Sequence, residues 1–238
     1  MPPLKTIGLL GGTSWPSTIE YYRLLNEMAQ ARLGGFHSAN ILLCSIDYHA
    51  IKSRYYERWS EIPALLEAEI RAFAALGPRG PECLVICNNT LHKAYDAIES
   101  RLALAIPVFH IVKVTGAAAR ARNAQRVLLL GTRFTMEDGF YHRGLEAFGL
   151  QVATPDEADR QTIQAIQSEL ARGAMKPEFR TAMAELIAKH AGSVDAVVLA
   201  CTELPLAVSQ VDCRIPVINP TEEQCRAAFA FAIGAQAA

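Results

Sequence analysis

The sequences TIGLLGG at residues 6–12 and RVLLLGT at residues 126–132 decide the fold, because they are two versions of one pattern. In each, an apolar run of strand length stops at glycine, which is typical of a buried strand in a parallel sheet. The similarity continues in the same order along the chain: ECLVICN at 82–88 matches DAVVLAC at 195–201, and IPV at 106–108 matches IPV at 215–217. Three matched segments in one order indicate that an α/β unit occurs twice.

The stretches between these apolar runs have helical spacing, for example residues 17–31, so the whole chain alternates between strand and helix patterns. Such alternation predicts parallel sheets covered by helices. Strands are expected at residues 5–10, 40–46, 83–86, 108–111, 126–130, 194–199 and 217–218. We therefore expect an α/β protein of two domains, one formed by residues 1–112 plus 212–238 and the other by residues 113–211.

The composition is that of a globular protein. Apolar residues make up 51% and charged residues 20%, and the net charge is -1, which excludes a disordered chain and gives no basic surface for nucleic acid. Residues 1–10 lack the apolar segment of a signal peptide, and no segment reaches the roughly 18 apolar residues of a membrane span. We expect a cytoplasmic protein with no nucleic-acid partner and no membrane association.

Six cysteines occur without an export signal, which favours reduced thiols over disulfides: Cys44, Cys83, Cys87, Cys201, Cys213 and Cys225. Their spacing contains no C-x2-C pair, so a zinc site is not expected. Gly11 and Gly12 do not belong to a G-x-G-x-x-G fingerprint, which argues against a nicotinamide cofactor. The sequence thus predicts a protein without a metal or cofactor.

Cys87 and Cys201 differ from the other four thiols because each ends a strand of the repeated unit. A helix that starts there stabilises a thiolate, so we expect both pKa values to lie below the reference of about 8.5. Two thiols on either side of one carbon atom, carrying one proton between them, suit a reaction that removes a proton from one face and delivers one to the other. That reaction is racemisation.

Polar side chains surround both cysteines. Asn89 and Thr90 follow Cys87, and Thr202 follows Cys201. Short polar side chains at helix starts bind carboxylates, but they also cap helices when no ligand is present. For these three residues the sequence leaves both interpretations open. His92, five positions after Cys87, is either a residue that orients the substrate or thiol or an ordinary buried histidine.

Four motifs carry a resemblance over nearly the whole chain: LGGTSW at residues 10–15, CNNTLH at 87–92, GTRFTM at 131–136 and CTEL at 201–204. With them the chain resembles the aspartate/glutamate racemase superfamily, and within it the branch of aspartate racemases and broad-specificity amino-acid racemases. The resemblance implies two pseudo-symmetric flavodoxin-like domains with parallel sheets, an active site in the cleft between them, and no pyridoxal phosphate or metal. It also implies a homodimer.

The resemblance also implies roles for individual residues. Cys87 and Cys201 are the expected acid/base pair. Residues expected to bind the amino-acid substrate are Thr13, Ser14, Asn89, Thr90, Thr132, Thr135, Thr202 and Glu203. Glu203 stands where glutamate racemases typically carry histidine, which favours the aspartate racemase side, whereas the longer cysteine motif at residues 87–92 resembles the broad-specificity branch.

Arg54 lies in the region where aspartate racemases place an arginine for the side-chain carboxylate, and a guanidinium suits bidentate carboxylate binding. Arg58 competes for this role. Other reactions of the superfamily, namely maleate isomerisation, hydantoin racemisation and malonate decarboxylation, stay open as alternatives. A non-catalytic protein that binds an acidic metabolite is a further alternative from another class.

Overall fold

The structure is a computed structural model that describes residues 3–55 and 57–235. The chain divides into two compact units, each described below by itself. The first unit extends to His110 and resumes at Gln224, and the second is Ile111–Glu223. The same order of segments is predicted from the sequence, with limits at 112/113 and 211/212, and those domain limits stay a prediction.

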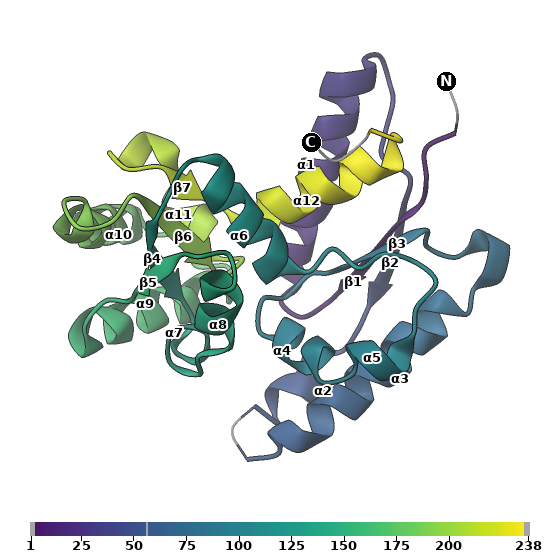
Figure 1. Cartoon of the computed structure of the whole chain (residues 1–238), viewed down its shortest axis with the longest axis horizontal. Helices are drawn as coiled ribbons and strands as arrows, with labels where there is room; N and C mark the ends of the chain where they lie inside the picture. Colours follow the sequence, from purple (N-terminus) through teal and green to yellow (C-terminus); the bar gives the residue numbers. More distant parts are fainter. Residues whose placement is uncertain (1–2, 56, 236–238) are drawn as a thin grey trace. The chain divides into compact units, whose positions relative to one another are not determined.

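The first unit contains a sheet of three parallel strands in the order β2-β1-β3 (Figure 1). Its strands are β1 (Ile7–Gly11), β2 (Ile41–Ser45) and β3 (Cys83–Ile86). Its α-helices are α1 (Trp15–Leu33), α2 (Tyr48–Lys52), α3 (Ile62–Ala74), α4 (Leu91–Asp96) and α5 (Glu99–Leu102), and α12 (Pro220–Ala232) enters it at Gln224. Two short 3-10 turns, η1 (Trp59–Glu61) and η2 (Gly77–Arg79), flank α3.

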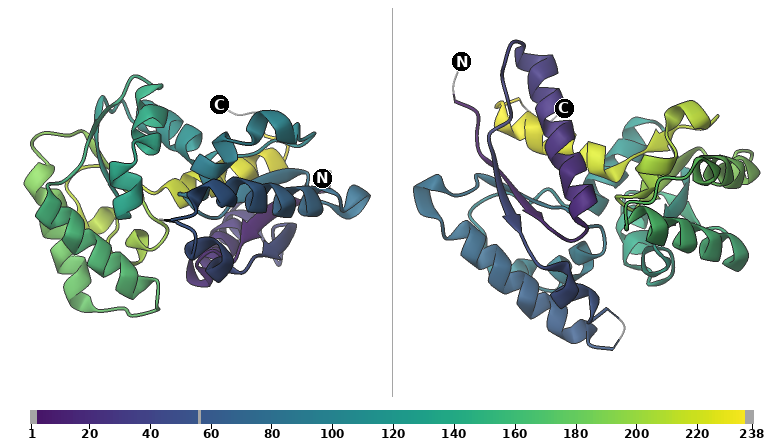
Figure 2. Two further views of the ribbon diagram at one scale, coloured as in Figure 1. Left: turned by 90° about the horizontal axis from the view of Figure 1, so that it is seen from below. Right: turned by 180° about the vertical axis from the view of Figure 1, so that it is seen from behind.

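Helices cover both faces of this sheet, as Figures 1 and 2 show. Leu9 and Val85 share one apolar cluster with buried residues of α1 and α12. Leu10 and Ile86 belong to the opposite cluster, with residues of α3 and α4. Because successive side chains of a strand point to opposite faces, a strand covered on both sides must be apolar throughout. This explains the uninterrupted apolar runs.

The second unit contains four parallel strands in the order β5-β4-β6-β7. They are β4 (Arg126–Gly131), β5 (Gln151–Ala153), β6 (Ala196–Ala200) and β7 (Val217–Ile218). One apolar cluster joins the sheet to α9 (Glu157–Leu170), α10 (Pro177–His190) and α11 (Leu204–Ala207). The other joins it to α6 (Ile111–Ala121) and α8 (Phe140–Glu146), while α7 (Arg133–Glu137) follows β4 and η3 (Gln210–Asp212) precedes β7.

The two units have one topology, as the repeated sequence segments predict. In the second unit, Val197 of β6 pairs with Val217 of β7, and the Val197 N–H donates to the Pro216 carbonyl at 2.9 Å. In the first unit, Leu84 of β3 forms a parallel bridge with Val108, and its N–H donates to the Pro107 carbonyl, also at 2.9 Å. The bridge at Val108 therefore occupies the position of a fourth strand. The α/β fold with parallel sheets is confirmed.

Two details of the predicted strand pattern are wrong. Residues 108–111 do not form a strand: Val108 makes a single bridge, Phe109 and His110 belong to no helix or strand, and Ile111 is the first residue of α6. Strand β5 was not expected, because QVA at residues 151–153 is too short and too polar to stand out as a strand pattern. It pairs with the first half of β4 at the edge of the sheet.

Candidate active site

The loop after β1 is forced into an unusual conformation. Gly12 has φ +86, and a Cβ there would lie 2.2 Å from the Ile46 carbonyl oxygen, so no other residue fits. Ser14 also has a positive φ of 79, which costs free energy for a residue with a side chain. Thr18 stabilises this turn, because its Oγ1 accepts the Gly12 N–H at 3.0 Å and donates to the Ser14 carbonyl at 3.3 Å.

Three predicted substrate-binding residues of this unit have buried polar atoms without a hydrogen-bond partner among the residues described. They are the hydroxyl oxygens of Thr13 and Ser14 and the amide oxygen of Asn89. Thr13 is only 1% exposed and Asn89 6%. A buried polar group without a partner is destabilising, so these three atoms are candidates for hydrogen bonds to a ligand.

The loop after β3 lies beside this turn. The strands β1 and β3 are paired up to Leu10 and Ile86, the Cys87 N–H donates to the Leu10 carbonyl, and Asn88 Nδ2 lies 3.5 Å from the Thr13 carbonyl oxygen. Asn88 also accepts the Leu91 N–H at 3.0 Å, so it is the residue that caps α4. Thr90, at the N-cap position, makes no capping bond with its side chain. The capping interpretation thus applies to Asn88.

The Cys87 thiol is completely buried. Its hydrogen bond is to the Val85 carbonyl, with an S to O distance of 3.9 Å. Burial raises the pKa of the thiol well above its ordinary value, and the neighbouring Cys225 adds to the increase. The expectation of a lowered pKa is therefore wrong for this residue, because the thiol is removed from solvent and α4 begins only at Leu91.

A buried polar cluster supports the helix that follows Cys87. The side chain of Gln224, which is 0% exposed, accepts a hydrogen bond from the Tyr21 hydroxyl at 2.8 Å, donates to the Phe109 carbonyl and lies 3.4 Å from Nε2 of His92. The rings of His92 and His110 are 4.4 Å apart. Sequence reasoning missed Gln224, since nothing in the sequence links it to a residue 132 positions away.

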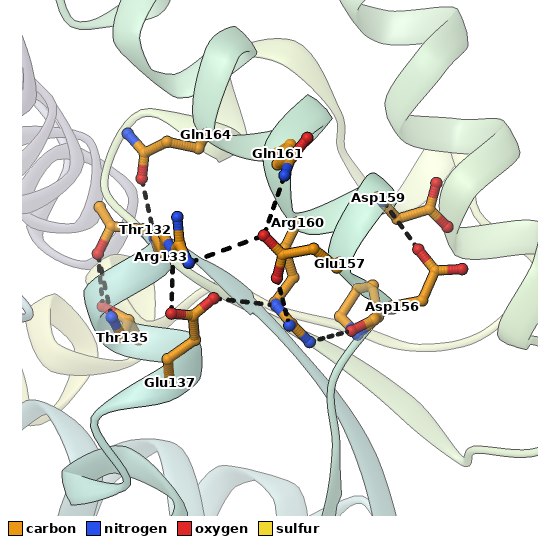
Figure 3. A network of polar contacts seen from close by, with 11 residues as sticks. Thr132, Arg133, Thr135, Glu137, Asp156, Glu157, Asp159, Arg160, Gln161 and Gln164 are labelled. Atoms are coloured by element: carbon orange, nitrogen blue, oxygen red, sulfur yellow. Dashed lines mark hydrogen bonds and ion pairs between the residues drawn. The ribbon is translucent and has the colours of Figure 1, made fainter.

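In the second unit, Thr132 follows β4 and caps α7, the helix that contains Thr135. Thr132 Oγ1 accepts the Thr135 N–H at 3.2 Å, and the two hydroxyl oxygens are 3.0 Å apart. Gln164 of α9 accepts the Arg133 N–H at 2.8 Å. Figure 3 shows that these contacts adjoin an ion-pair network between α7 and α9 formed by Arg133, Glu137, Glu157 and Arg160. The network holds the start of α7 against α9.

Cys201, Thr202 and Glu203 follow β6, the strand next to β4, and all three are buried. The Cys201 thiol donates to Glu203 Oε2 at 2.8 Å, and the Thr202 hydroxyl donates to the same oxygen at 3.0 Å. Burial raises the pKa of the Cys201 thiol well above its ordinary value and the negative Glu203 carboxylate raises it further, while the backbone N–H groups of Glu203 and Leu204 act in the opposite direction. The predicted lowering is again wrong.

The two cysteines are not strictly equivalent. Leu10 pairs with Ile86 in the first sheet and Leu130 with Leu199 in the second, so Cys201 stands one residue farther along its strand than Cys87 does. A shift of one residue moves a side chain to the other face of a sheet. Accordingly, Cys87 belongs to the apolar cluster of α1 and α12, whereas Cys201 belongs to the cluster of α9 and α10.

Arg54 is engaged with neighbours in its own loop. Its Nε donates to Glu61 at 2.7 Å, and its Nη1 donates to the Ala50 carbonyl. Arg58, the competing residue, is half-exposed and lies 4.0 Å from the same carboxylate. Arg54 thus already has a carboxylate and a carbonyl as partners, and its role in binding the substrate stays a prediction.

Two further findings concern metal binding and membrane spans. Within residues 3–55 and 57–235, no three His, Cys, Asp or Glu side chains converge as a metal site requires. None of the helices in that part of the chain has both the length and the apolar character needed to cross a membrane.

Comparison with known proteins gives a consistent picture. The family model for Asp/Glu/hydantoin racemase matches residues 10–228. A curated relative, the broad-specificity amino-acid racemase RacX of Bacillus subtilis (strain 168), is 26% identical over 216 residues, which is 90% of this chain and 92% of that protein.

Solved structures agree with this match. A candidate Asp/Glu racemase from Yersinia pestis is 38% identical, with a TM-score of 0.84 over 97% of this chain and 100% of that one. PH1733 from Pyrococcus horikoshii OT3, described as an aspartate racemase homologue, is 29% identical, with the same TM-score and the same coverage. Both matches extend over nearly the full length of the chains compared.

Proposed function

The chain belongs to the Asp/Glu/hydantoin racemase family, and from this we propose that it is an amino-acid racemase that uses Cys87 and Cys201 as an acid/base pair without pyridoxal phosphate or a metal. The observation that carries the proposal is the position of one buried thiol directly after the corresponding strand of each unit, β3 and β6. The substrates are aspartate, glutamate or a wider set of amino acids.

The reaction requires that one of the two cysteines is a thiolate while the other is a neutral thiol. One cysteine, as the thiolate, removes the Cα proton, and the other, as the thiol, delivers its proton to the opposite face of the planar carbanion. Afterwards the two cysteines have exchanged protonation states, so the product enantiomer is a substrate for the reverse reaction. The scheme requires that both thiols reach opposite faces of one Cα atom.

The partnerless atoms of the first unit have the right polarity for an amino acid. The hydroxyl groups of Thr13 and Ser14 can donate to an α-carboxylate, and the amide oxygen of Asn89 can accept from an α-ammonium group. Hydrogen bonds to charged groups are about twice as strong as neutral ones. Binding would therefore compensate for the desolvation of these atoms and for the backbone strain at Ser14.

The range of side chains accepted stays part of the proposal. The relative from Bacillus subtilis is named a broad-specificity enzyme, which supports a wider set of amino acids. Aspartate or glutamate would instead need a cation such as Arg54, released from Glu61. Reduced thiols suit a reducing compartment such as the cytoplasm, and a homodimer is the assembly we propose from the resemblance to the superfamily.

A panel of single-enantiomer amino acids in D2O tests the proposal. Deuterium uptake at Cα and loss of optical rotation should occur together for at least one amino acid. Solvent exchange on hydantoins or reaction of maleate, with none on amino acids, would favour another reaction of the family. Tight binding of an acidic metabolite without any exchange would favour the non-catalytic alternative.

Variants of the two cysteines test the residue assignment. Cys87→Ser and Cys201→Ser should each abolish racemisation, because a serine hydroxyl is far too weak an acid to replace a thiol at neutral pH. One of the two variants can still exchange the Cα proton of a single enantiomer, since the remaining thiol keeps access to one face. Cys213→Ser, at a half-buried cysteine outside the motifs, is the matched control and should keep full activity.

A further inference from the structure

Large apolar side chains that are exposed in the described part of the chain are concentrated in the first unit, on α1, on β2 and in the turn between them. They are Trp15, Ile19, Tyr22, Phe36 and Leu43. The remaining exposed ones are far apart in the sequence: Leu76, Met175 and Val211. We refer to the first five residues as the α1/β2 patch. A contiguous apolar patch on the surface of a protein marks an interaction site.

The residues of the patch on α1 form a single stripe. Trp15, Ile19 and Tyr22 have i, i+4 and i+7 spacing, which places them on one face of the helix, and they are 68%, 52% and 55% exposed. Asn26 continues the same face, and its Oδ1 accepts the Ala39 N–H at 3.1 Å. Because Ala39 belongs to the segment that leads into β2, the stripe lies on the β2 side of α1.

β2 is an edge strand, because among the described residues β1 is the one strand paired with it. The Asn40 carbonyl and the Ile46 N–H both form hydrogen bonds with β1. Backbone groups alternate in direction along a strand, so the N–H and C=O groups of Ile41, Leu43 and Ser45 point to the open edge. β2 contains neither a charged residue nor proline, which are features that prevent an edge strand from pairing with another chain.

Leu43 connects the open edge of β2 to the stripe on α1. Its side chain is 49% exposed. A Cβ on Gly11 would lie 2.5 Å from Cγ2 of Thr18, a residue of α1, and 3.1 Å from Cδ1 of Leu43. The Leu43 side chain therefore lies on the face of the sheet that α1 covers, next to the helix. The stripe and the edge of β2 thus form one surface.

We propose that a second copy of this chain covers the α1/β2 patch, with β2 paired antiparallel to its own copy about a two-fold axis at Leu43. In this register Leu43 lies opposite its copy and Ile41 lies opposite the copy of Ser45, so the backbone groups at the open edge bond to one another. The same axis brings the two α1 stripes together. This assigns a surface to the homodimer and does not depend on the reaction proposed above.

The charges beside the stripe favour a second copy over a charged partner. Arg23 forms ion pairs of 2.7 Å with Glu20 and with Glu27, all three on α1. Because these charges already have partners within the helix, they do not form a block of one sign that would attract an oppositely charged protein. An apolar stripe and an uncharged strand edge are complementary to themselves, as an interface about a two-fold axis requires.

Sedimentation of the full chain over a range of concentrations tests the proposal. The wild type should form a dimer of 26.0 kDa subunits. Leu43→Lys places two positive charges at the two-fold axis and Ile19→Lys places one in each stripe, so each should raise the Kd of the dimer about 100-fold or more. Met175→Lys, at an exposed residue of the second unit, is the matched control and should leave this Kd unchanged.

Amide hydrogen exchange at single-residue resolution distinguishes pairing of β2 from contact between side chains alone. The Leu43 N–H should be protected in the wild-type dimer and should exchange faster by about tenfold or more in the Ile19→Lys monomer. The Leu42 N–H, which points to β1, should be protected in both. Equal exchange of the Leu43 N–H in the dimer and the monomer would overturn the proposed pairing.

The sedimentation results can overturn the proposal as well. A wild-type chain that stays monomeric, or a dimer that neither Leu43→Lys nor Ile19→Lys weakens, would show that the patch is not the interface. If Leu43→Lys loses its melting transition, Ile19→Lys carries the test, because it changes an exposed position outside the sheet. These measurements need no substrate, so failure of the proposed function and failure of the proposed interface are distinguishable.

Discussion

Replacing Thr13 by valine should stabilise the protein and weaken its reaction at the same time. Valine has the shape of threonine with a methyl group in place of the hydroxyl. The Thr13 hydroxyl oxygen is buried without a hydrogen-bond partner in the described part of the chain, and the residue is 1% exposed. The folded protein therefore loses nothing when the hydroxyl is removed, whereas a bound carboxylate loses a donor.

The magnitudes follow from this geometry. A buried hydroxyl without a partner costs about 1–3 kcal/mol in mutational data, so Thr13→Val should raise the free energy of unfolding by about 1 kcal/mol or more. For a chain of this size, that increase corresponds to roughly 2–4 °C in Tm per kcal/mol. A hydrogen bond to a charged group contributes about 1.5–3 kcal/mol, so kcat/KM should fall roughly 10- to 150-fold.

The assay pairs thermal melting with initial racemisation rates, and Thr18→Val is the matched control. The same atoms change in the control, but the Thr18 hydroxyl accepts from the Gly12 N–H and donates to the Ser14 carbonyl. The control should therefore lose about 1–3 kcal/mol of stability. If Thr13→Val is destabilised as much as Thr18→Val, or if its kcat/KM is unchanged, the reasoning about partnerless atoms is refuted.

Three further predictions concern the buried polar groups. Gln224→Leu should cost about 2–4 kcal/mol in urea unfolding, because the Tyr21 hydroxyl and the Phe109 carbonyl lose a buried partner; a loss below about 1 kcal/mol would contradict this. Burial raises the pKa of Cys83 to about 12, so above about pH 8.5 the unfolded thiol ionises while the folded one does not. The free energy of unfolding should therefore fall by roughly 2 kcal/mol more between pH 8.5 and 10 in the wild type than in Cys83→Ala; equal losses would contradict it. Burial raises the pKa of both site thiols, so the fraction of thiolate should increase with pH between 6.5 and 8. We therefore expect kcat/KM to rise in this range, approaching tenfold per pH unit. A value of kcat/KM that does not change with pH would contradict the requirement for a thiolate.

Much of the fold is visible in the sequence because the unit occurs twice. The matched segments at 82–88 and 195–201 align Leu84 with Val197, and those two residues do form equivalent pairs with Val108 and Val217. Strand β5 and the single bridge at Val108 were misjudged, since edge strands of one to three residues carry too little pattern to distinguish them from loops. Hydrogen bonding to the neighbouring strand, β4 for β5 and β3 for Val108, determines the structure of these segments.

The candidate site was only partly predictable. Sequence motifs locate Thr13, Asn89 and Glu203, but whether a side chain has a partner depends on atoms far away in the sequence. The direction of the thiol pKa values was mispredicted for the same reason: a helix start is readable from the sequence, whereas complete burial of Cys87 is not. The ion pair that engages Arg54 with Glu61 was likewise invisible, because loop geometry sets it.

The two-thiol scheme is tested most directly by the first few per cent of racemisation in D2O, with deuterium measured separately in the recovered substrate and in the product enantiomer. If one cysteine removes the proton and the other delivers a different one, the product carries solvent deuterium while the recovered substrate still carries protium. Product that retains the protium of the substrate would show that a single group removes and returns the same proton, which contradicts the roles assigned to Cys87 and Cys201.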